Sequence, residues 1–215
     1  MNSVEKTAEF IKNKFYGEHT GHDWWHMLRV WTLAQQIAKE EKNVDLEVVG
    51  LAALLHDIAD FKFHKGDMDI GPKEARKWLI SIGVPEKTTA HVEDIVRNVS
   101  FKGAGVKSNL ETLEGQIVHD ADKLDAMGAV GIARAFAFGG AFGREIYNPS
   151  IKPDEHKTFD AYKVNQSSSL NHFHEKLLLL KNRMYTATGK KLANDRHKYM
   201  ETYLKEFHKE WDGKA

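Results

Sequence analysis

Cysteine is absent from the 215 residues of this chain, and its absence excludes several kinds of functional site. Disulfide bonds, thiolate nucleophiles and cysteine-ligated zinc centres are all ruled out. A bound metal ion would therefore have to be held by histidine, aspartate or glutamate side chains.

An excess of charge of either sign is also missing. Lys plus Arg and Asp plus Glu are equal at 31 each, so the formal net charge is zero. Proteins that coat nucleic acids carry a strongly basic surface, and this balance argues against such a function while leaving room for a local basic pocket. We expect no nucleic-acid partner.

Long apolar runs are missing as well. No window approaches the roughly eighteen apolar residues of a membrane span, and the first ten residues contain no apolar signal core. We therefore expect a cytoplasmic protein with no membrane partner.

Strand-like alternation is nearly absent, and only four prolines occur. Apolar residues recur instead with a period near 3.6, which predicts an all-α fold. No repeat or linker divides the chain, so we expect a single domain over residues 1–215. Helices are predicted after caps at Asp45 and Ser108, and over residues 4–15, about 22–42, 72–83, 85–99, 129–138, 167–181 and 188–211.

The most informative stretch runs from Leu51 to Asp60. Seven of its ten residues are apolar, which indicates a helix enclosed by protein on most sides. Helical spacing places Ala53, His56, Asp57 and Asp60 on one face. Buried carboxylates are usually paired or bound to a metal, because burying an unpaired charge is costly. The alternative is a polar, solvated helix end, and this stretch alone does not decide between the two.

Two other apolar stretches carry ligands of the kind that bind metals. His22 and His26 lie one helical turn apart in the segment His22–Asp–Trp–Trp–His26, whose tryptophans we expect in the core. Asp120 and Asp122 follow an apolar run further along the chain. A lone His–x–x–x–His pair is more often explained by a capping or core histidine. Three such stretches together indicate a metal site much more strongly.

These motifs resemble the HD superfamily of metal-dependent phosphohydrolases, an all-α family. Its pattern of a His, an adjacent His–Asp pair and a distant Asp is matched by His26, Leu54–Asp57 and Asp120–Gly128. Further segments resemble the bacterial subgroup that includes nucleoside triphosphate pyrophosphohydrolases, namely Ser100–Lys102, Gly131–Arg134, Phe138–Gly140 and His172–Leu177. The resemblance implies a motif-bearing core at about residues 20–140, with C-terminal helices at about residues 156–211 packed on it.

The resemblance also implies that His26, His56, Asp57 and Asp122 hold a divalent metal ion. Asp120 competes with Asp122, but the family's order of Ala, Asp, a basic residue and Leu points to Asp122. This mixed nitrogen and oxygen set favours manganese, with cobalt, nickel, iron or zinc as alternatives and magnesium as a weaker fit.

Two positions depart from the subgroup pattern. Lys123 stands where the subgroup often has arginine, which keeps the positive charge but loses the bidentate fork. His119 stands where an amide is expected, so an additional titratable group lies next to Asp120. Neither departure removes an expected metal ligand.

Catalytic and substrate-binding roles follow from the same resemblance. Asp60 is expected to act as general base or to orient the attacking water. The alternative is a helix-end carboxylate that holds a histidine lying just outside the metal ligands. Lys123 is assigned to catalysis, and His22, Lys62, Lys102 and Arg134 to substrate binding. For each cationic residue the alternative is a solvated surface charge, and for His22 the alternative is that it only orients His26.

We expect metal-dependent hydrolysis of a nucleotide, with a nucleoside or deoxynucleoside triphosphate cut at the α-phosphorus to give a monophosphate and pyrophosphate. The alternatives are attack at the γ-phosphorus, hydrolysis of a nucleoside monophosphate, and removal of pyrophosphate from a signalling nucleotide. A non-catalytic nucleotide-sensing module on the same fold is an alternative of another class. The long helices and many aromatic residues also permit a homodimer.

Overall fold

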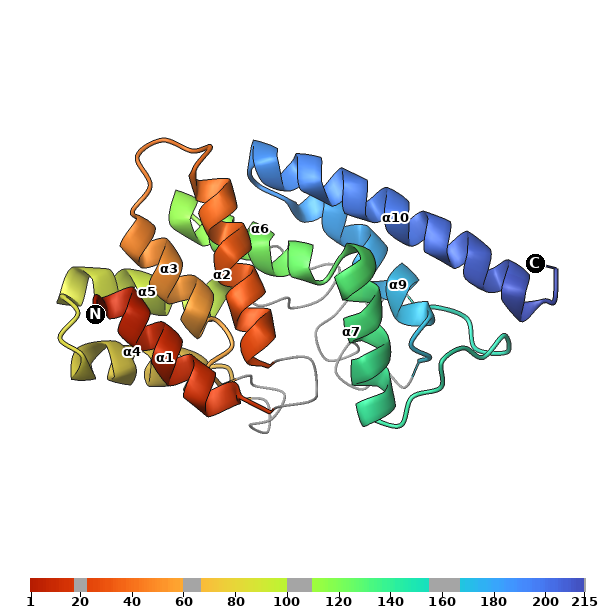
Figure 1. The fold of residues 1–215 in the computed structure, drawn as a ribbon, viewed down its shortest axis with the longest axis horizontal. Coiled ribbons are helices and arrows are strands. Elements are labelled where there is room, and N and C mark those ends of the chain that lie inside the picture. Colours follow the sequence, from red (N-terminus) through yellow and green to blue (C-terminus); the bar gives the residue numbers. More distant parts are fainter. Residues whose placement is uncertain (18–22, 60–66, 100–109, 155–166, 215) are drawn as a thin grey trace. The chain divides into compact units, whose positions relative to one another are not determined.

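The computed structural model describes residues 1–17, 23–59, 67–99, 110–154 and 167–214, which form helices and connecting turns without any strand (Figure 1). The all-α prediction is confirmed. The chain groups into two compact units, the first ending at Asp122 and the second beginning at Lys123. None of the helices in these ranges is both long and apolar enough to cross a membrane.

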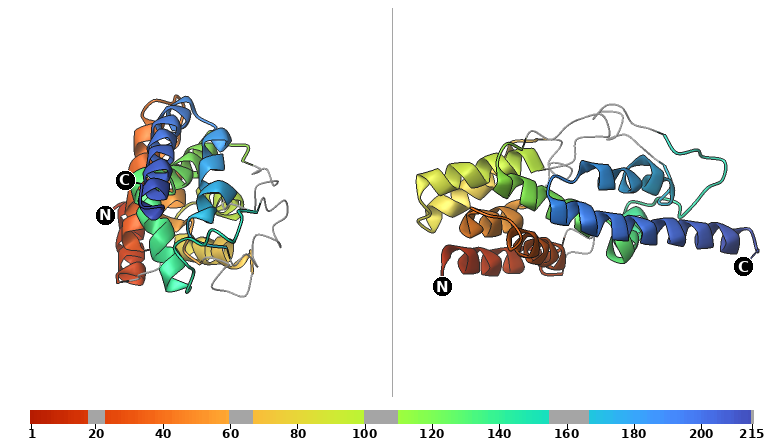
Figure 2. Two further views of the ribbon diagram at one scale, coloured as in Figure 1. Left: turned by 90° about the vertical axis from the view of Figure 1, so that its right-hand side faces the viewer. Right: turned by 90° about the horizontal axis from the view of Figure 1, so that it is seen from above.

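The described part of the first unit contains five complete helices and most of a sixth. Helices α1 and α2 pack on α3, and α5 packs on both α3 and α4, as the views in Figure 2 show. Helix α3 is therefore the central element of this unit. The helices are α1 (Ser3–Phe15), α2 (Trp24–Ala38), α3 (Leu46–Leu55), α4 (Ile70–Ser81), α5 (Glu86–Val99) and α6 (Leu113–Asp125).

Helix α3 is buried on all sides, as its composition predicts. Every residue from Val48 to Leu55 is buried, and a helix that is apolar all round needs such an environment. The predicted cap at Asp45 is confirmed, because its Oδ1 atom accepts hydrogen bonds from the backbone N–H groups of Glu47 and Val48 at 3.0 and 3.2 Å. Helix α3 ends at Leu55, however, so the expectation that it continues to residue 60 is wrong.

Within the described residues, the second unit contains α7 (Gly128–Ala141), α9 (Asn171–Glu175), the 3₁₀ helix η2 (Leu177–Arg183) and α10 (Ala187–Trp211). Helix α10 packs on α7 and on η2, and α9 packs on η2. Helix α7 extends three residues beyond its predicted end at residue 138, through two glycines that we expected in a loop.

The predicted helix over residues 167–181 is wrong, because α9 stops at Glu175 and a 3₁₀ helix follows. Lys176 lies between them with φ −143° and ψ −58°. Leu177 and Leu180 are the buried residues of η2. Residues three apart share one side of a 3₁₀ helix, so this geometry turns both leucines toward the interior.

Two further expectations about helix starts and burial are wrong. Helix α6 begins at Leu113 rather than after Ser108, and the Thr112 hydroxyl accepts a hydrogen bond from the backbone N–H of Gly115 at 3.3 Å. Of the two tryptophans expected in the core, Trp24 is buried but Trp25 is 53% exposed.

Candidate metal centre

His26 is placed by the start of α2. Asp23 is the N-cap of this helix, and its carboxylate accepts a hydrogen bond from the backbone N–H of His26 at 2.8 Å. The cap fixes where the helix begins, and the His26 side chain is fully buried. This role of Asp23 was not predicted from the sequence, although an aspartate just before an apolar helical segment is a usual capping signal.

His56 is placed by the end of α3. It is the C-cap residue, and its Nδ1 atom lies 2.8 Å from the carbonyl oxygen of Ala53. A carbonyl oxygen only accepts, so Nδ1 carries the proton and donates it to Ala53. This hydrogen bond also satisfies one of the carbonyl groups left unpaired at a helix end. When the imidazole is neutral, Nε2 therefore carries the lone pair.

Four side chains from three helix ends and turns converge on one point of the first unit. The Nε2 atoms of His26 and His56 are 3.2 Å apart. Asp57 Oδ2 lies 3.5 and 3.4 Å from these two nitrogens, and Asp122 Oδ1 lies 3.8 and 3.7 Å from them. We refer to His26, His56, Asp57 and Asp122 as the metal cluster.

The spacing and charge of the metal cluster fit one divalent cation. Ligand atoms about 2.0–2.2 Å from a common metal lie roughly 3.0–3.5 Å from one another, and the separations involving the two histidine nitrogens are 3.2–3.8 Å. The ligand atoms of His26, His56 and Asp122 all lie within 4.8 Å of one another. Two carboxylates and two neutral imidazoles carry two negative charges, so a divalent cation would balance them. The imidazoles are only 1% exposed, whereas the side chains of Asp57 and Asp122 are 15% and 20% exposed. The carboxylate side of the cluster is therefore the accessible one.

The electrostatic environment of His56 reflects the same clustering. Burial lowers the pKa of its imidazole, but the carboxylates of Asp57 and Asp122 favour the protonated form more strongly. Without a cation, the pKa of His56 therefore lies well above its usual value of about 6.5. A proton shared with the carboxylates stands in for part of the charge that a metal ion would supply.

His119 and Asp120, which precede Asp122 on α6, are also buried. His119 and Asp120 are 1% and 0% exposed, and His119 Nδ1 lies 3.3 Å from Asp120 Oδ1. The carboxylate that meets the two Nε2 atoms is thus that of Asp122, while the Asp120 carboxylate lies beside His119.

Two of the predicted cationic residues belong to the second unit. Lys123 is buried, at 3% exposure. Arg134 donates a hydrogen bond from Nη1 to Asp125 Oδ2 at 2.9 Å, and this aspartate is buried. The remaining predicted site residues lie outside the described ranges, and these are His22, Asp60, Lys62 and Lys102.

Comparison with known proteins gives a consistent result. Residues 24–127, which contain all four members of the metal cluster, match the HD domain family model. The uncharacterized protein YpgQ of Bacillus subtilis is 35% identical over 215 residues, covering 99% of this chain and 96% of YpgQ.

Solved structures resemble the chain over nearly its whole length. A Lactobacillus plantarum protein is 32% identical with a TM-score of 0.86 over 99% of both chains. An HD-superfamily hydrolase from Bacillus thuringiensis is 38% identical with a TM-score of 0.72, over 97% of this chain and 96% of that one. The structure of YpgQ in complex with ADP is also similar: it is 31% identical to this chain, with a TM-score of 0.73 over 99% of this chain and 100% of YpgQ. The chain belongs to the HD-domain family of metal-dependent phosphohydrolases.

Proposed function

We propose that His26, His56, Asp57 and Asp122 hold one divalent metal ion, most readily manganese, and that the protein hydrolyses nucleoside or deoxynucleoside triphosphates to monophosphates and pyrophosphate. The observation that carries this proposal is that two Nε2 atoms lie 3.2 Å apart, with a carboxylate oxygen of Asp57 and one of Asp122 each 3.4–3.8 Å from both nitrogens. Structural ion pairs seldom bring two imidazoles and two carboxylates together in a buried position, because each charge must then be compensated.

The bound metal ion would supply a water of lowered pKa and would polarise a phosphoryl oxygen. The protein's own contribution is to hold the ligand atoms in place. The hydrogen bond from His56 to the Ala53 carbonyl keeps the His56 lone pair on Nε2, and loss of such an orienting bond typically weakens metal sites by about 10- to 100-fold. The Asp23 cap fixes the first turn of α2 and with it His26.

The nucleotide part of the proposal is supported by YpgQ, whose structure was solved in complex with ADP and which is similar to this chain over its full length. A triphosphate carries several negative charges, and cationic side chains stabilise the additional charge of the transition state. We assign this task to Lys62, Lys102, Lys123 and Arg134, with His22 as a further substrate contact. Asp60 is proposed to accept a proton from the attacking water or to orient it.

The proposed reaction places the attack at the α-phosphorus. The water oxygen forms a bond to this phosphorus, the bond from the phosphorus to the bridging oxygen of the β-phosphate breaks, and pyrophosphate leaves with that oxygen. The proton released by the water passes to Asp60 or to solvent. Holding water and phosphorus about 3–3.5 Å apart would make the attack effectively intramolecular.

Hydrolysis of a nucleoside triphosphate in ¹⁸O-labelled water, with manganese restored to chelated protein, tests this proposal. We expect label in the nucleoside monophosphate and unlabelled pyrophosphate. Labelled orthophosphate would instead show attack at the γ-phosphorus. If neither product forms from any nucleoside mono-, di- or triphosphate, the proposed substrate class is wrong.

A further inference from the structure

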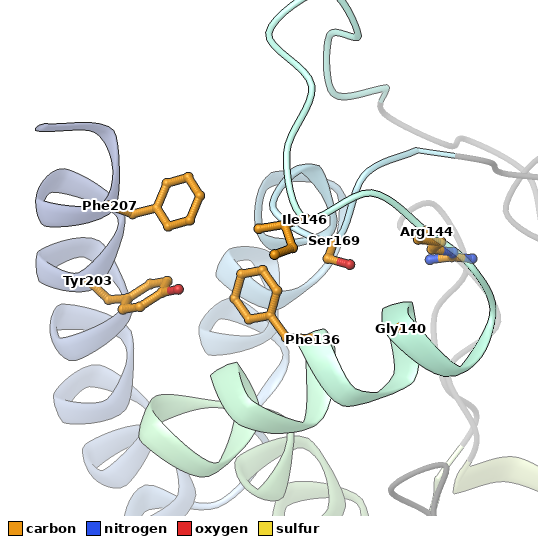
Figure 3. A pocket seen from close by; sticks show the side chains of 7 residues that line it. All are labelled: Phe136, Gly140, Arg144, Ile146, Ser169, Tyr203 and Phe207. Carbon is orange, nitrogen blue, oxygen red and sulfur yellow. The ribbon is translucent and has the colours of Figure 1, made fainter. Parts of the chain in front are cut away.

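The second unit contains a pocket of about 430 Å³ between α7, the segment that follows it, and α10 (Figure 3). The volume falls within the range of about 300–1,000 Å³ that is usual for small-molecule sites. Phe136 of α7 and Tyr203 and Phe207 of α10 form its aromatic wall. The pocket contains none of the metal cluster's residues.

The aromatic wall is held in place by further aromatic contacts. Tyr203 and Phe207 are one turn apart on α10 and so share a face. The Tyr203 ring stacks on buried Phe173, with centroids 5.9 Å apart, and meets the edge of Phe136 at 6.2 Å. Phe207 packs edge-to-face on Tyr147 at 6.0 Å. The wall therefore presents fixed ring surfaces on which a planar molecule can stack.

The end of α7 positions a cationic residue at the opposite side of the pocket. Arg144 donates its backbone N–H to the Gly139 carbonyl at 2.8 Å, and Gly143 donates to Gly140 at 3.2 Å. Gly143 adopts φ +68°, which a glycine accepts without strain. This pattern is a Schellman motif, and it fixes the backbone of Arg144 at the pocket. Figure 3 shows the Arg144 side chain at one end of the pocket and the aromatic rings toward the other.

Two hydroxyl groups complete the polar part of the lining. Ser169 is buried, and its backbone N–H is bonded to the Glu145 carbonyl at 2.9 Å, next to Arg144. Tyr203 adds a phenol whose pKa is raised by burial, so that it stays protonated and can donate. Apolar walls with a few fixed polar groups are the usual composition of a ligand site.

Gly140 lines the pocket and is exposed, so α7 leaves room there for a larger side chain. A Cβ atom added there would have no described atom within 4 Å, and the backbone does not have positive φ. Neither packing nor conformation therefore requires glycine, which costs up to about 1 kcal/mol relative to alanine inside a helix. The neighbouring Gly139 differs, because a Cβ atom there would overlap the Ser169 hydroxyl.

We propose that this pocket binds a small planar aromatic molecule that carries one anionic group, with the ring against Phe136, Tyr203 and Phe207 and the anion toward Arg144 and Ser169. The pocket shares no residue with the metal cluster, and the proposal does not depend on the function assigned to that cluster.

The test uses the full-length, metal-free protein and naphthalene-2-sulfonate as probe, followed by isothermal titration calorimetry. We expect one molecule bound per chain. Substitution Gly140→Leu should place a side chain in the pocket and weaken binding at least tenfold. Substitution Arg144→Gln should weaken binding of the sulfonate about tenfold or more, because a charge-assisted hydrogen bond is lost. The same substitution should change binding of the neutral probe naphthalene-2-methanol less than twofold.

Tyr199→Ala is the matched control, since Tyr199 is a 55% exposed aromatic residue of α10 that does not line the pocket. This substitution should leave binding unchanged. If Gly140→Leu fails to fold, Arg144→Gln decides alone.

Three results would overturn the proposal: no binding of the sulfonate, several molecules bound per chain, or an equal loss of affinity in Tyr199→Ala. An unchanged affinity of Arg144→Gln for the sulfonate would overturn its anionic part. Displacement of the probe by adenosine monophosphate would identify a nucleotide as the ligand, and displacement only by an aryl carboxylate would identify an aromatic acid.

Discussion

The metal cluster of the first unit and the aromatic pocket of the second make opposite demands on their ligands. In the cluster, two carboxylates are brought near two buried imidazoles, and their negative charges require compensation. The pocket has mainly apolar walls, so without a ligand it contains no uncompensated buried charge. Stability should therefore depend strongly on a ligand in the first case and weakly in the second.

The largest expected effect is on turnover, and it comes from removing one member of the metal cluster. Asp122→Asn keeps the size of the side chain but removes the negative charge that faces both Nε2 atoms. We expect hydrolysis to fall by more than the roughly 10- to 100-fold that loss of a partner of a metal ligand costs. Steady-state kinetics with manganese provide the measurement. Asp94→Asn on α5, where the aspartate is exposed, is the matched control, and equal turnover of the two variants would refute the assignment of Asp122.

The next effect is on thermal stability, and it comes from removing the metal. A ligand present at about 100 times its Kd stabilises the folded state by roughly 2.7 kcal/mol. In a protein of this size each kcal/mol raises Tm by about 2–4 °C, so manganese should raise Tm by roughly 5–10 °C. Differential scanning calorimetry of chelated and reloaded protein measures this shift. The shift should disappear in His56→Ala, and a shift that persists there would place the stabilising metal elsewhere.

Replacing two glycines of α7 by alanine should change the free energy of unfolding by smaller amounts and in opposite directions. Gly131→Ala would force a Cβ atom into the backbone carbonyl group of Ala126, whereas Gly140→Ala meets no described atom within 4 Å. We expect Gly131→Ala to destabilise by about 2 kcal/mol or more, and Gly140→Ala to stabilise by up to about 1 kcal/mol. Urea denaturation of both variants measures the difference. Destabilisation by Gly140→Ala would show that this glycine has a structural role and would weaken the argument for an open pocket.

The smallest effect is a pH dependence of the metal-free protein. The folded-state pKa of His56 is raised above the unfolded value of about 6.5. Its proton therefore stabilises the fold below about pH 6.5, and this contribution is lost as the pH rises through the folded-state pKa. We expect the Tm of chelated wild type to fall with rising pH relative to that of His56→Gln. A wild-type Tm that rises relative to the variant would contradict the raised pKa. Manganese affinity should change in the other direction, increasing with pH, because the metal displaces this proton.

The features predicted correctly from sequence are those that depend on short-range patterns. Asp45 caps α3 because its carboxylate reaches backbone N–H groups two and three residues ahead, a distance that sequence spacing fixes. Ala53 and His56 were also predicted to be neighbours, and they are. They are joined by a hydrogen bond at the end of α3 and not by a longer helix. The burial of α3 follows directly from its nearly continuous apolar composition.

The features that sequence did not predict depend on competition between similar local signals or on distant contacts. Ser108 and Thr112 are both good capping residues, and pattern alone does not select the Thr112 cap that forms. The break at Lys176 depends on how Leu177 and Leu180 pack. The pocket is lined by residues of α7 and α10 and by Ser169, which are far apart in the sequence. Its existence is therefore decided by tertiary packing.

The most direct test of the central claim is the anomalous scattering of crystals grown with manganese. We predict one strong peak per chain within bonding distance, about 2.0–2.3 Å, of His26 Nε2, His56 Nε2, Asp57 Oδ2 and Asp122 Oδ1. The same data from Asp122→Asn crystals should show a much weaker peak. A manganese peak at other residues, or none at these four in crystals of active protein, would contradict the account.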